Sequence, residues 1–174
     1  MSPEESKAAL IAILQNAHAG EYAASLAYDG HAKSVSDPAE KSDIRRILKE
    51  ELKHRELVRG LLESLGAAPD PAKERKLALI GGTISLLCRI GGWFIPMYGA
   101  GRLEAGNIVE YQDAARHARG AGRPDMLDCL LTMAEVEWDH ELYFRRKVES
   151  SAWSRVVPLW RIPPPRETIR AVSA

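Results

Sequence analysis

The sequence predicts an all-α fold of four long helices, and three observations support this prediction. Apolar residues recur at steps of three and four in four separate stretches, which is the period of an amphipathic helix. Two short breaks and one long central connection, all containing Pro or Gly, separate these stretches. No stretch alternates apolar and polar residues as a half-buried strand does. With 174 residues, the chain can bury one compact core.

The first predicted helix covers about residues 4–33. Its apolar stripe includes Leu10 and Tyr28, and Glu21 lies in the same stripe. The run Ser36-Asp37-Pro38 ends this helix and begins the next, because Asp can cap a first turn and Pro suits that turn.

The second predicted helix begins at Pro38 and ends at Gly66 and Pro69. Its seam alternates steps of four and three, so a Glu and a His three residues apart fall among apolar side chains. The predicted seam consists of Ile44, Ile47, Glu51, His54, Val58, Leu61 and Leu65.

The central connection contains a short basic stretch and then an apolar run from Leu77 to Tyr98. We expect a short apolar helix within it. Arg89, Pro96 and four glycines make this run poor material for a spanning helix, which needs about 20 clean apolar residues. The run is therefore buried across the bundle, buried in a dimer, or exposed at a membrane surface.

The third predicted helix follows Pro96 and ends near Arg119, and the fourth follows Pro124. Two short turns and one long middle connection give two antiparallel hairpins. The predicted fold is thus a ferritin-like four-helix bundle with one long crossover connection carrying a short apolar helix. We expect this domain at 1–149 and a proline-rich tail at 150–174, which docks on the bundle, on a second subunit or on anionic lipid.

Each half of the bundle carries the same polar pattern, which predicts a two-metal carboxylate site. A seam Glu is followed seven residues later by Tyr, and the next helix carries Glu-x-x-His. An isolated ionised carboxylate in an apolar seam would be very costly, so four of them need a positive counter-charge. Two divalent ions supply it. The predicted ligands are Glu21, Glu51 and His54 for one metal and Glu104, Glu137 and His140 for the other, with Glu51 and Glu137 bridging.

Oxygen and imidazole donors without thiolate favour iron or manganese and do not by themselves exclude zinc, and we expect two iron ions, with manganese as the alternative. Tyr28 and Tyr111 are expected in the core, where their hydroxyls can bond ligand carboxylates or take part in redox chemistry. Glu110 is a rival ligand, but it lies about 120° around the helix from Glu104.

Other polar residues are expected outside the ligand set. His18 lies one turn before Glu21, and packing or surface exposure is favoured over a place beside the ligands. The remaining residues are expected at the surface, and they are His31, His117, Glu50, Glu135 and Glu141.

Composition excludes some classes of function. Lys plus Arg equals Asp plus Glu at 24 each, so no overall field attracts nucleic acid. Cys88 and Cys129 form no Cys-x-x-Cys motif, and the acidic N-terminus does not resemble a signal peptide. We expect a cytoplasmic protein with peripheral contact at the inner face of the membrane.

The segment from Ala19 to Ala24, with its Gly-Glu-Tyr, resembles the opening motif of the demethoxyubiquinone hydroxylase family, and the likeness covers roughly residues 10–146. The resemblance implies a di-iron centre that uses dioxygen and two electrons to hydroxylate a quinone ring, on a bundle lying against the membrane. Three features depart from the family pattern. Lys53 stands where the family often has an acidic residue, Glu110 stands where it often has His, and the tail lacks the family's long apolar helix.

The sequence therefore predicts a di-iron oxidoreductase that activates dioxygen, acts on a quinone or other apolar small molecule, and takes electrons from an external donor. A homodimer is expected. Two alternatives stay open. One is a ferritin- or rubrerythrin-like protein that oxidises iron or reduces peroxide, and the other is a structural bundle that metals hold together.

Overall fold

The computed structural model describes residues 1–173, which contain five α-helices and no strand. This confirms the all-α ferritin-like class. The described residues form two compact units. We call Ile11–Pro96 the α1–α3 unit, and we call Met1–Leu10 together with the residues from Met97 onward the α4–α5 unit.

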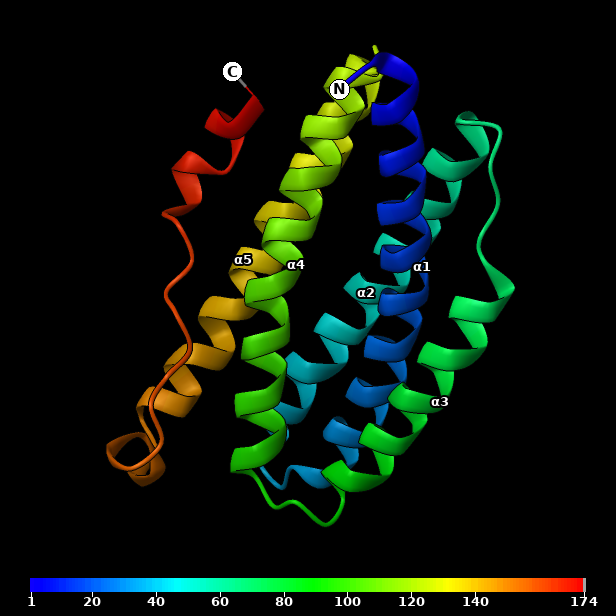
Figure 1. Ribbon diagram of the computed structural model, residues 1–174. Coiled ribbons are helices and arrows are strands. Elements are labelled where there is room, and N and C mark those ends of the chain that lie inside the picture. The colour runs from blue at the N-terminus through cyan, green and yellow to red at the C-terminus, as the bar shows by residue number, and fades with distance from the viewer. Residues whose placement is uncertain (174) are drawn as a thin grey trace. The chain divides into compact units, whose positions relative to one another are not determined.

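The α1–α3 unit is built from α2 (Pro38–Ser64), α3 (Pro71–Cys88) and the part of α1 (Pro3–Ser34) that follows Leu10. Both of its turns end in an Asp-Pro pair. The Asp37 carboxylate accepts hydrogen bonds from the first amides of α2, and Asp70 does the same for α3. The stop and restart predicted at Ser36-Asp37-Pro38 is confirmed, and α1 and α2 form an antiparallel hairpin (Figure 1).

The buried face of α2 follows the predicted seam with one difference. Leu62 is fully buried, whereas Leu61 is only half-buried. A straight helix has 3.6 residues per turn, whereas alternating steps of four and three average 3.5. By the last turns of α2 the buried positions therefore differ from those of the strict alternation. The remaining seam residues are buried as predicted, and they are Ile44, Ile47, Glu51, His54, Val58 and Leu65.

Helix α3 begins at Pro71, so the basic stretch before Leu77 is helical and the helix spans 18 residues. It lies against α1 at two glycines. A Cβ at Gly81 would lie 2.5 Å from the Ala23 carbonyl oxygen, and one at Gly30 would meet Ser85. These close approaches need residues without side chains.

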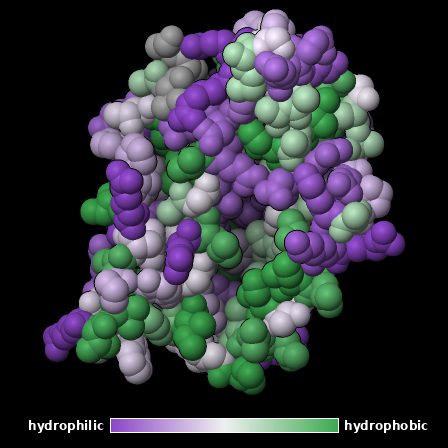
Figure 2. All heavy atoms as spheres, in the orientation of Figure 1, coloured by the Kyte–Doolittle hydropathy of each residue, from purple (hydrophilic) through white to green (hydrophobic). Residues whose placement is uncertain are grey.

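The other side of α3 is exposed and apolar. Leu79 is 74% exposed and Leu86 is 61% exposed, and apolar side chains gather on the surface where α3 lies (Figures 1 and 2). This face of α3 is therefore exposed and is not buried within the α1–α3 unit. None of the helices within residues 1–173 is long and apolar enough to cross a bilayer.

The α4–α5 unit contains α4 (Phe94–Gly120), a short 3₁₀ turn (Pro124–Met126) and α5 (Leu127–Glu149). Gly122, with φ of +70°, makes the tight turn between the two helices. Helices α4 and α5 lie side by side as an antiparallel hairpin (Figure 1). Their core is apolar and fully buried, and includes Met97, Ile108, Leu130, Met133 and Phe144.

The tail packs on α4 and α5 within the same unit. The Trp160 indole donates a hydrogen bond of 2.6 Å to Glu141 and stacks edge-on against Tyr98, with ring centroids 5.2 Å apart. Further along, Arg170 pairs with Asp128 and Glu135 on α5. Of the three places predicted for the tail, the structure therefore shows docking on the bundle helices. The division into a 1–149 domain and a separate tail stays a prediction.

Candidate metal centre

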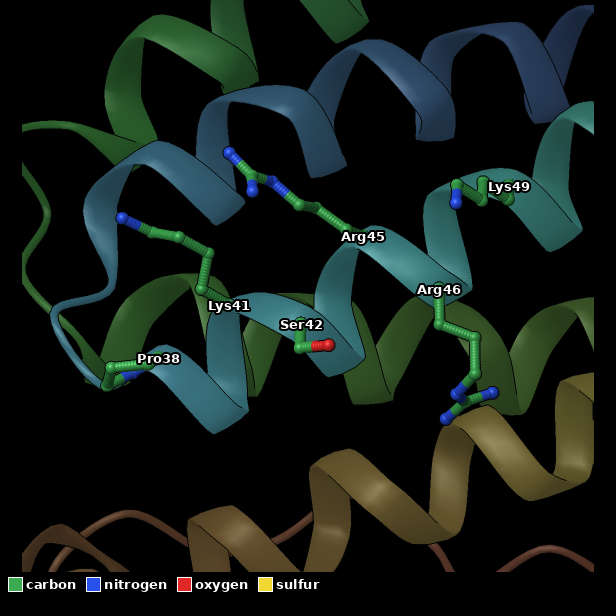
Figure 3. A pocket seen from close by; sticks show the side chains of 6 residues that line it. All are labelled: Pro38, Lys41, Ser42, Arg45, Arg46 and Lys49. Carbon is green, nitrogen blue, oxygen red and sulfur yellow. The ribbon is translucent and has the colours of Figure 1, made fainter.

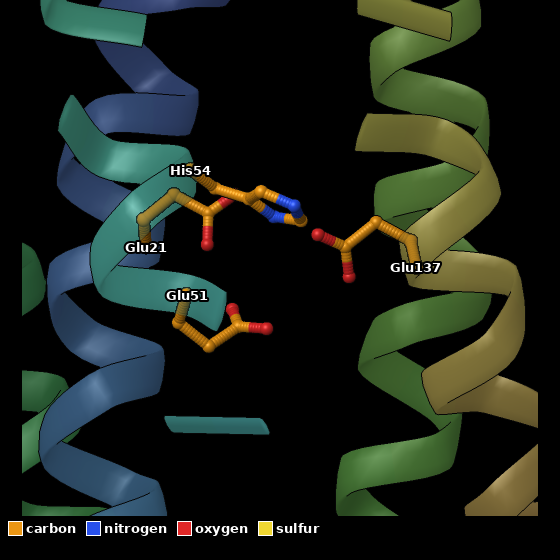
Figure 4. Close-up of side chains that lie close together, drawn as sticks. All are labelled: Glu21, Glu51, His54 and Glu137. Carbon is orange, nitrogen blue, oxygen red and sulfur yellow. The ribbon is translucent and has the colours of Figure 1, made fainter. Parts of the chain in front are cut away.

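The α1–α3 unit brings three predicted ligands together. Glu21 comes from α1, and Glu51 and His54 come from α2; each is at most 4% exposed. One donor atom from each lies within 4.8 Å of the others. In Figure 4 their polar ends extend into a common region, and Glu137 of the other unit is drawn as well. We call these three residues the first half-site.

The sequence of α2 explains this placement. Glu51 and His54 are three residues apart, so they lie on one face of the helix. Ile47 and Val58, both fully buried, occupy the same face one turn to either side. Packing of these apolar neighbours carries both polar side chains into the interior.

The α4–α5 unit brings the other three predicted ligands together. Glu104 comes from α4, and Glu137 and His140 come from α5; each is at most 1% exposed. Their donor atoms also lie within 4.8 Å of one another. The Asn107 amide donates hydrogen bonds of 3.0 Å to Glu104 and 3.5 Å to Glu137. We call Glu104, Glu137 and His140 the second half-site.

The donor geometry fits a divalent ion in each half-site. His54 Nδ1 lies 3.9 Å from Glu21 Oε1, and His140 Nδ1 lies 3.7 Å from Glu137 Oε2. Both distances exceed a normal hydrogen bond. Bonds from a metal to imidazole nitrogen or carboxylate oxygen are about 2 Å long, so two donors of one ion can be separated by up to about 4 Å.

The donor chemistry fits as well. Each half-site places two carboxylates and one imidazole in the interior of an apolar unit. Two buried negative charges close together repel strongly, so they need protons or a cation. Oxygen and nitrogen donors of this kind suit iron or manganese.

The remaining predicted site residues behave as follows. Tyr28 and Tyr111 are buried in the core, as predicted. Glu104 is buried whereas Glu110 is half-buried, which agrees with the choice of Glu104. Whether either tyrosine bonds a ligand or takes part in redox chemistry stays a prediction.

Two of the residues expected at the surface are buried. Glu141 is 1% exposed because it accepts hydrogen bonds from both Arg145 and Trp160. The spacing of four residues between Glu141 and Arg145 could have indicated this pair from the sequence. Nothing in the sequence indicated the contact with Trp160 of the tail. His31 is 2% exposed, and burial lowers its pKa to about 4.

His18 is also buried, at 1% exposed, which agrees with the packing role favoured for it. Its partner is unexpected. Nδ1 of His18 lies 2.6 Å from a carboxylate oxygen of Glu74, which belongs to α3. No spacing in the sequence links these two residues, because 56 positions separate them.

A basic groove on α2 holds none of the predicted site residues (Figure 3). Cationic side chains dominate it, which makes it unsuitable for a metal ion. Its lining consists of Pro38, Lys41, Ser42, Arg45, Arg46 and Lys49.

The fold and the two half-sites define a ferritin-like helical protein with buried carboxylate and imidazole groups that could hold metal. Residues 8–88 match the sequence model of the family described as "Ubiquinone biosynthesis protein COQ7". Over these residues the match confirms the resemblance indicated by the sequence, and residues 89–146 of the predicted resemblance lie outside it. It contains Glu21, Glu51 and His54, and it ends at Cys88, before α4. No curated protein and no solved structure gives a significant match.

Proposed function

We propose that this chain is a di-iron oxidoreductase that uses dioxygen to hydroxylate a quinone or another apolar small molecule. The observation that carries the proposal is the burial of two carboxylates and one imidazole in each unit, within a chain whose first half matches a ubiquinone-biosynthesis family. Manganese is the alternative metal, since the donor set suits both.

In this proposal Glu21, Glu51 and His54 would hold one ion, and Glu104, Glu137 and His140 would hold the other. Bound iron would supply redox electrons and an open coordination position for dioxygen. The side chains contribute negative charge that balances the ions, and their burial keeps bulk water away.

Asn107 supports the second half-site. Its amide donates to Glu104 and to Glu137, and so restricts the rotation of both carboxylates. Such outer hydrogen bonds typically change metal affinity by about 10- to 100-fold.

The exposed face of α3 supports an apolar substrate that reaches the protein from lipid. Leu79, Leu86 and Leu87 are all more than half exposed, which is unusual for large apolar residues on one helix. A helix face of this kind can lie in a bilayer interface without crossing it. The proposal therefore includes peripheral membrane contact through this face, and it keeps the homodimer and the external electron donor predicted from the sequence.

The test combines metal binding with oxygen chemistry. Anaerobic titration with ferrous ion is expected to give two ions per chain, and addition of oxygen, a reductant and a short-chain quinone is expected to give quinone-dependent oxygen consumption. Iron oxidation that is independent of every quinone tried would instead favour the iron-oxidising alternative. Stabilisation by metal without any oxygen consumption would favour the structural one.

A further inference from the structure

Glu74 of α3 joins α1 and α2 beside the first half-site. One of its carboxylate oxygens lies 2.6 Å from His18 Nδ1 on α1, and the other accepts a 2.7 Å hydrogen bond from Arg55 Nη2 on α2. The two partners adjoin ligands: His18 is one turn before Glu21, and Arg55 directly follows His54.

A second contact ties the same two helices together. The Arg55 guanidinium lies over the Tyr22 ring, 4.2 Å from its centroid, and Tyr22 directly follows Glu21. Tyr22 and Arg55, which directly follow the predicted ligands Glu21 and His54, are therefore in direct contact with each other. This pair and the Glu74 bridge span α1 and α2 at the level where Glu21 and His54 approach.

The protonation of His18 suits the bridge. Burial lowers the pKa of His18 against the opposing effect of its hydrogen bond to Glu74, so the ring is neutral near pH 7. A neutral imidazole beside a carboxylate donates its Nδ1 proton. The charged groups facing it are Glu74 on α3 and Arg55 and Arg59 on α2.

Stability alone does not explain this network. Within the described residues, His18 Nε2 and Arg55 Nε are buried without a hydrogen-bond partner. Each such atom costs about 1–3 kcal/mol. The Arg55 and Glu74 side chains are 22% and 19% exposed, and ion pairs at such positions often contribute little net stability, whereas they can fix one arrangement among several.

We propose that Glu74 is a positioning residue that holds α1 and α2 at the separation the first half-site needs, and so sets its metal affinity. This inference rests on the proposed function for its metal readout. The geometric effect itself does not need metal, because it concerns the placement of the Glu21 and His54 backbones.

The test compares three variants. Glu74→Ala removes both bonds. Glu74→Gln keeps an oxygen for Arg55, and its amide can donate to His18 Nδ1 once the ring carries its proton on Nε2, so it is expected to rescue the geometry. Glu135→Ala is the matched control, because Glu135 also pairs with an arginine and its side chain is 16% exposed against 19% for Glu74.

In metal-free protein, Glu74→Ala is expected to shift and broaden the backbone amide resonances of Glu21 and His54, while Glu74→Gln and Glu135→Ala leave them in place. Unchanged Glu21 and His54 resonances in Glu74→Ala would overturn the proposal. So would equal changes throughout the chain, which would indicate a general loss of stability.

In ferrous titrations well below the unfolding temperature, Glu74→Ala is expected to weaken one of the two binding steps by about 10- to 100-fold, with Glu74→Gln restoring it. Equal weakening of both steps would count against a local role. If the wild-type chain bound no metal while Glu74→Ala still displaced Glu21 and His54, the proposed function would fail and the positioning role would stand.

Discussion

The two half-sites carry the same ligands but are supported in different ways. Around the first, support comes from charged and aromatic side chains on three helices, with Glu74 at the centre. Around the second, one neutral amide, Asn107, contacts two of the ligands directly. Identical donors therefore do not imply identical surroundings.

The two units also differ in how much apolar surface they leave exposed. The α1–α3 unit leaves the apolar side of α3 open, with Leu79 and Leu86 exposed. In the α4–α5 unit the tail packs on the helices through Trp160 and Arg170. One unit is thus suited to contact with an apolar partner, and the other covers part of its own surface.

The largest expected effect comes from removing a ligand carboxylate. Glu51→Ala is expected to reduce ferrous binding from two ions per chain to one, because it removes one of the two carboxylates of the first half-site. Glu137→Ala should do the same from the other unit. Isothermal titration under anaerobic conditions measures the stoichiometry.

Glu50→Ala is the control for that experiment. Glu50 adjoins Glu51 in the sequence, but its carboxylate pairs with Arg46 on the surface of α2. It should leave two ions bound. A Glu51→Ala variant that still binds two ions would show that this carboxylate is not a metal ligand.

A second prediction compares the two units in acid. The pKa of His31 is lowered to about 4 by burial, whereas an unfolded His titrates near 6.5. Between these values the unfolded chain binds more protons than the folded chain. The contribution of His31 to the free energy of unfolding is therefore complete above pH 6.5 and is lost as the pH falls towards 4. The shift corresponds to about 3 kcal/mol.

His31→Leu is therefore expected to flatten the pH dependence of unfolding of the metal-free protein by about that amount. Urea unfolding at pH 7, 5.5 and 4.5 measures it. His117→Leu, at a half-buried position near the end of α4, serves as the control in the other unit. Equal flattening in both variants would remove His31 as the cause.

The sequence predicted the helices and the buried ligands for the same reason. Periodicity reports which side of a helix is apolar, and Glu51 and His54 share that side with Ile47 and Val58. Asp-Pro pairs reported where α2 and α3 begin, because capping is a local interaction.

Contacts between distant segments could not be predicted in this way. His18 and Glu74 meet only because α3 packs closely on α1 at Gly81, and the sequence gives no register for that packing. Glu141 is buried because Trp160 of the tail reaches it. Both depend on tertiary packing, which a single periodic pattern does not determine.

A third prediction sharpens the difference between the half-sites. Asn107→Ala removes both amide hydrogen bonds to Glu104 and Glu137, and is expected to weaken one ferrous binding step by about 10- to 100-fold. Glu74→Ala should weaken the other step. If the double variant weakened only a single step, the two supports would act on one ion and the comparison would be wrong.

The smallest expected effect concerns how firmly each unit is packed. Gly81→Ala would drive a methyl group against the Ala23 backbone, which cannot move away easily, and should cost about 1–3 kcal/mol. Gly101→Ala would meet the Trp160 ring of the tail and also the Cβ of the buried Phe144, 2.9 Å away, so a loss of similar size with a change in Trp fluorescence is expected. Gly82→Ala and Gly99→Ala, where a Cβ meets nothing within 4 Å, are the controls and should stabilise by up to about 1 kcal/mol. Urea unfolding of the four variants measures the losses, and a Gly81→Ala variant as stable as the controls would mean that α3 does not pack closely on the Ala23 backbone.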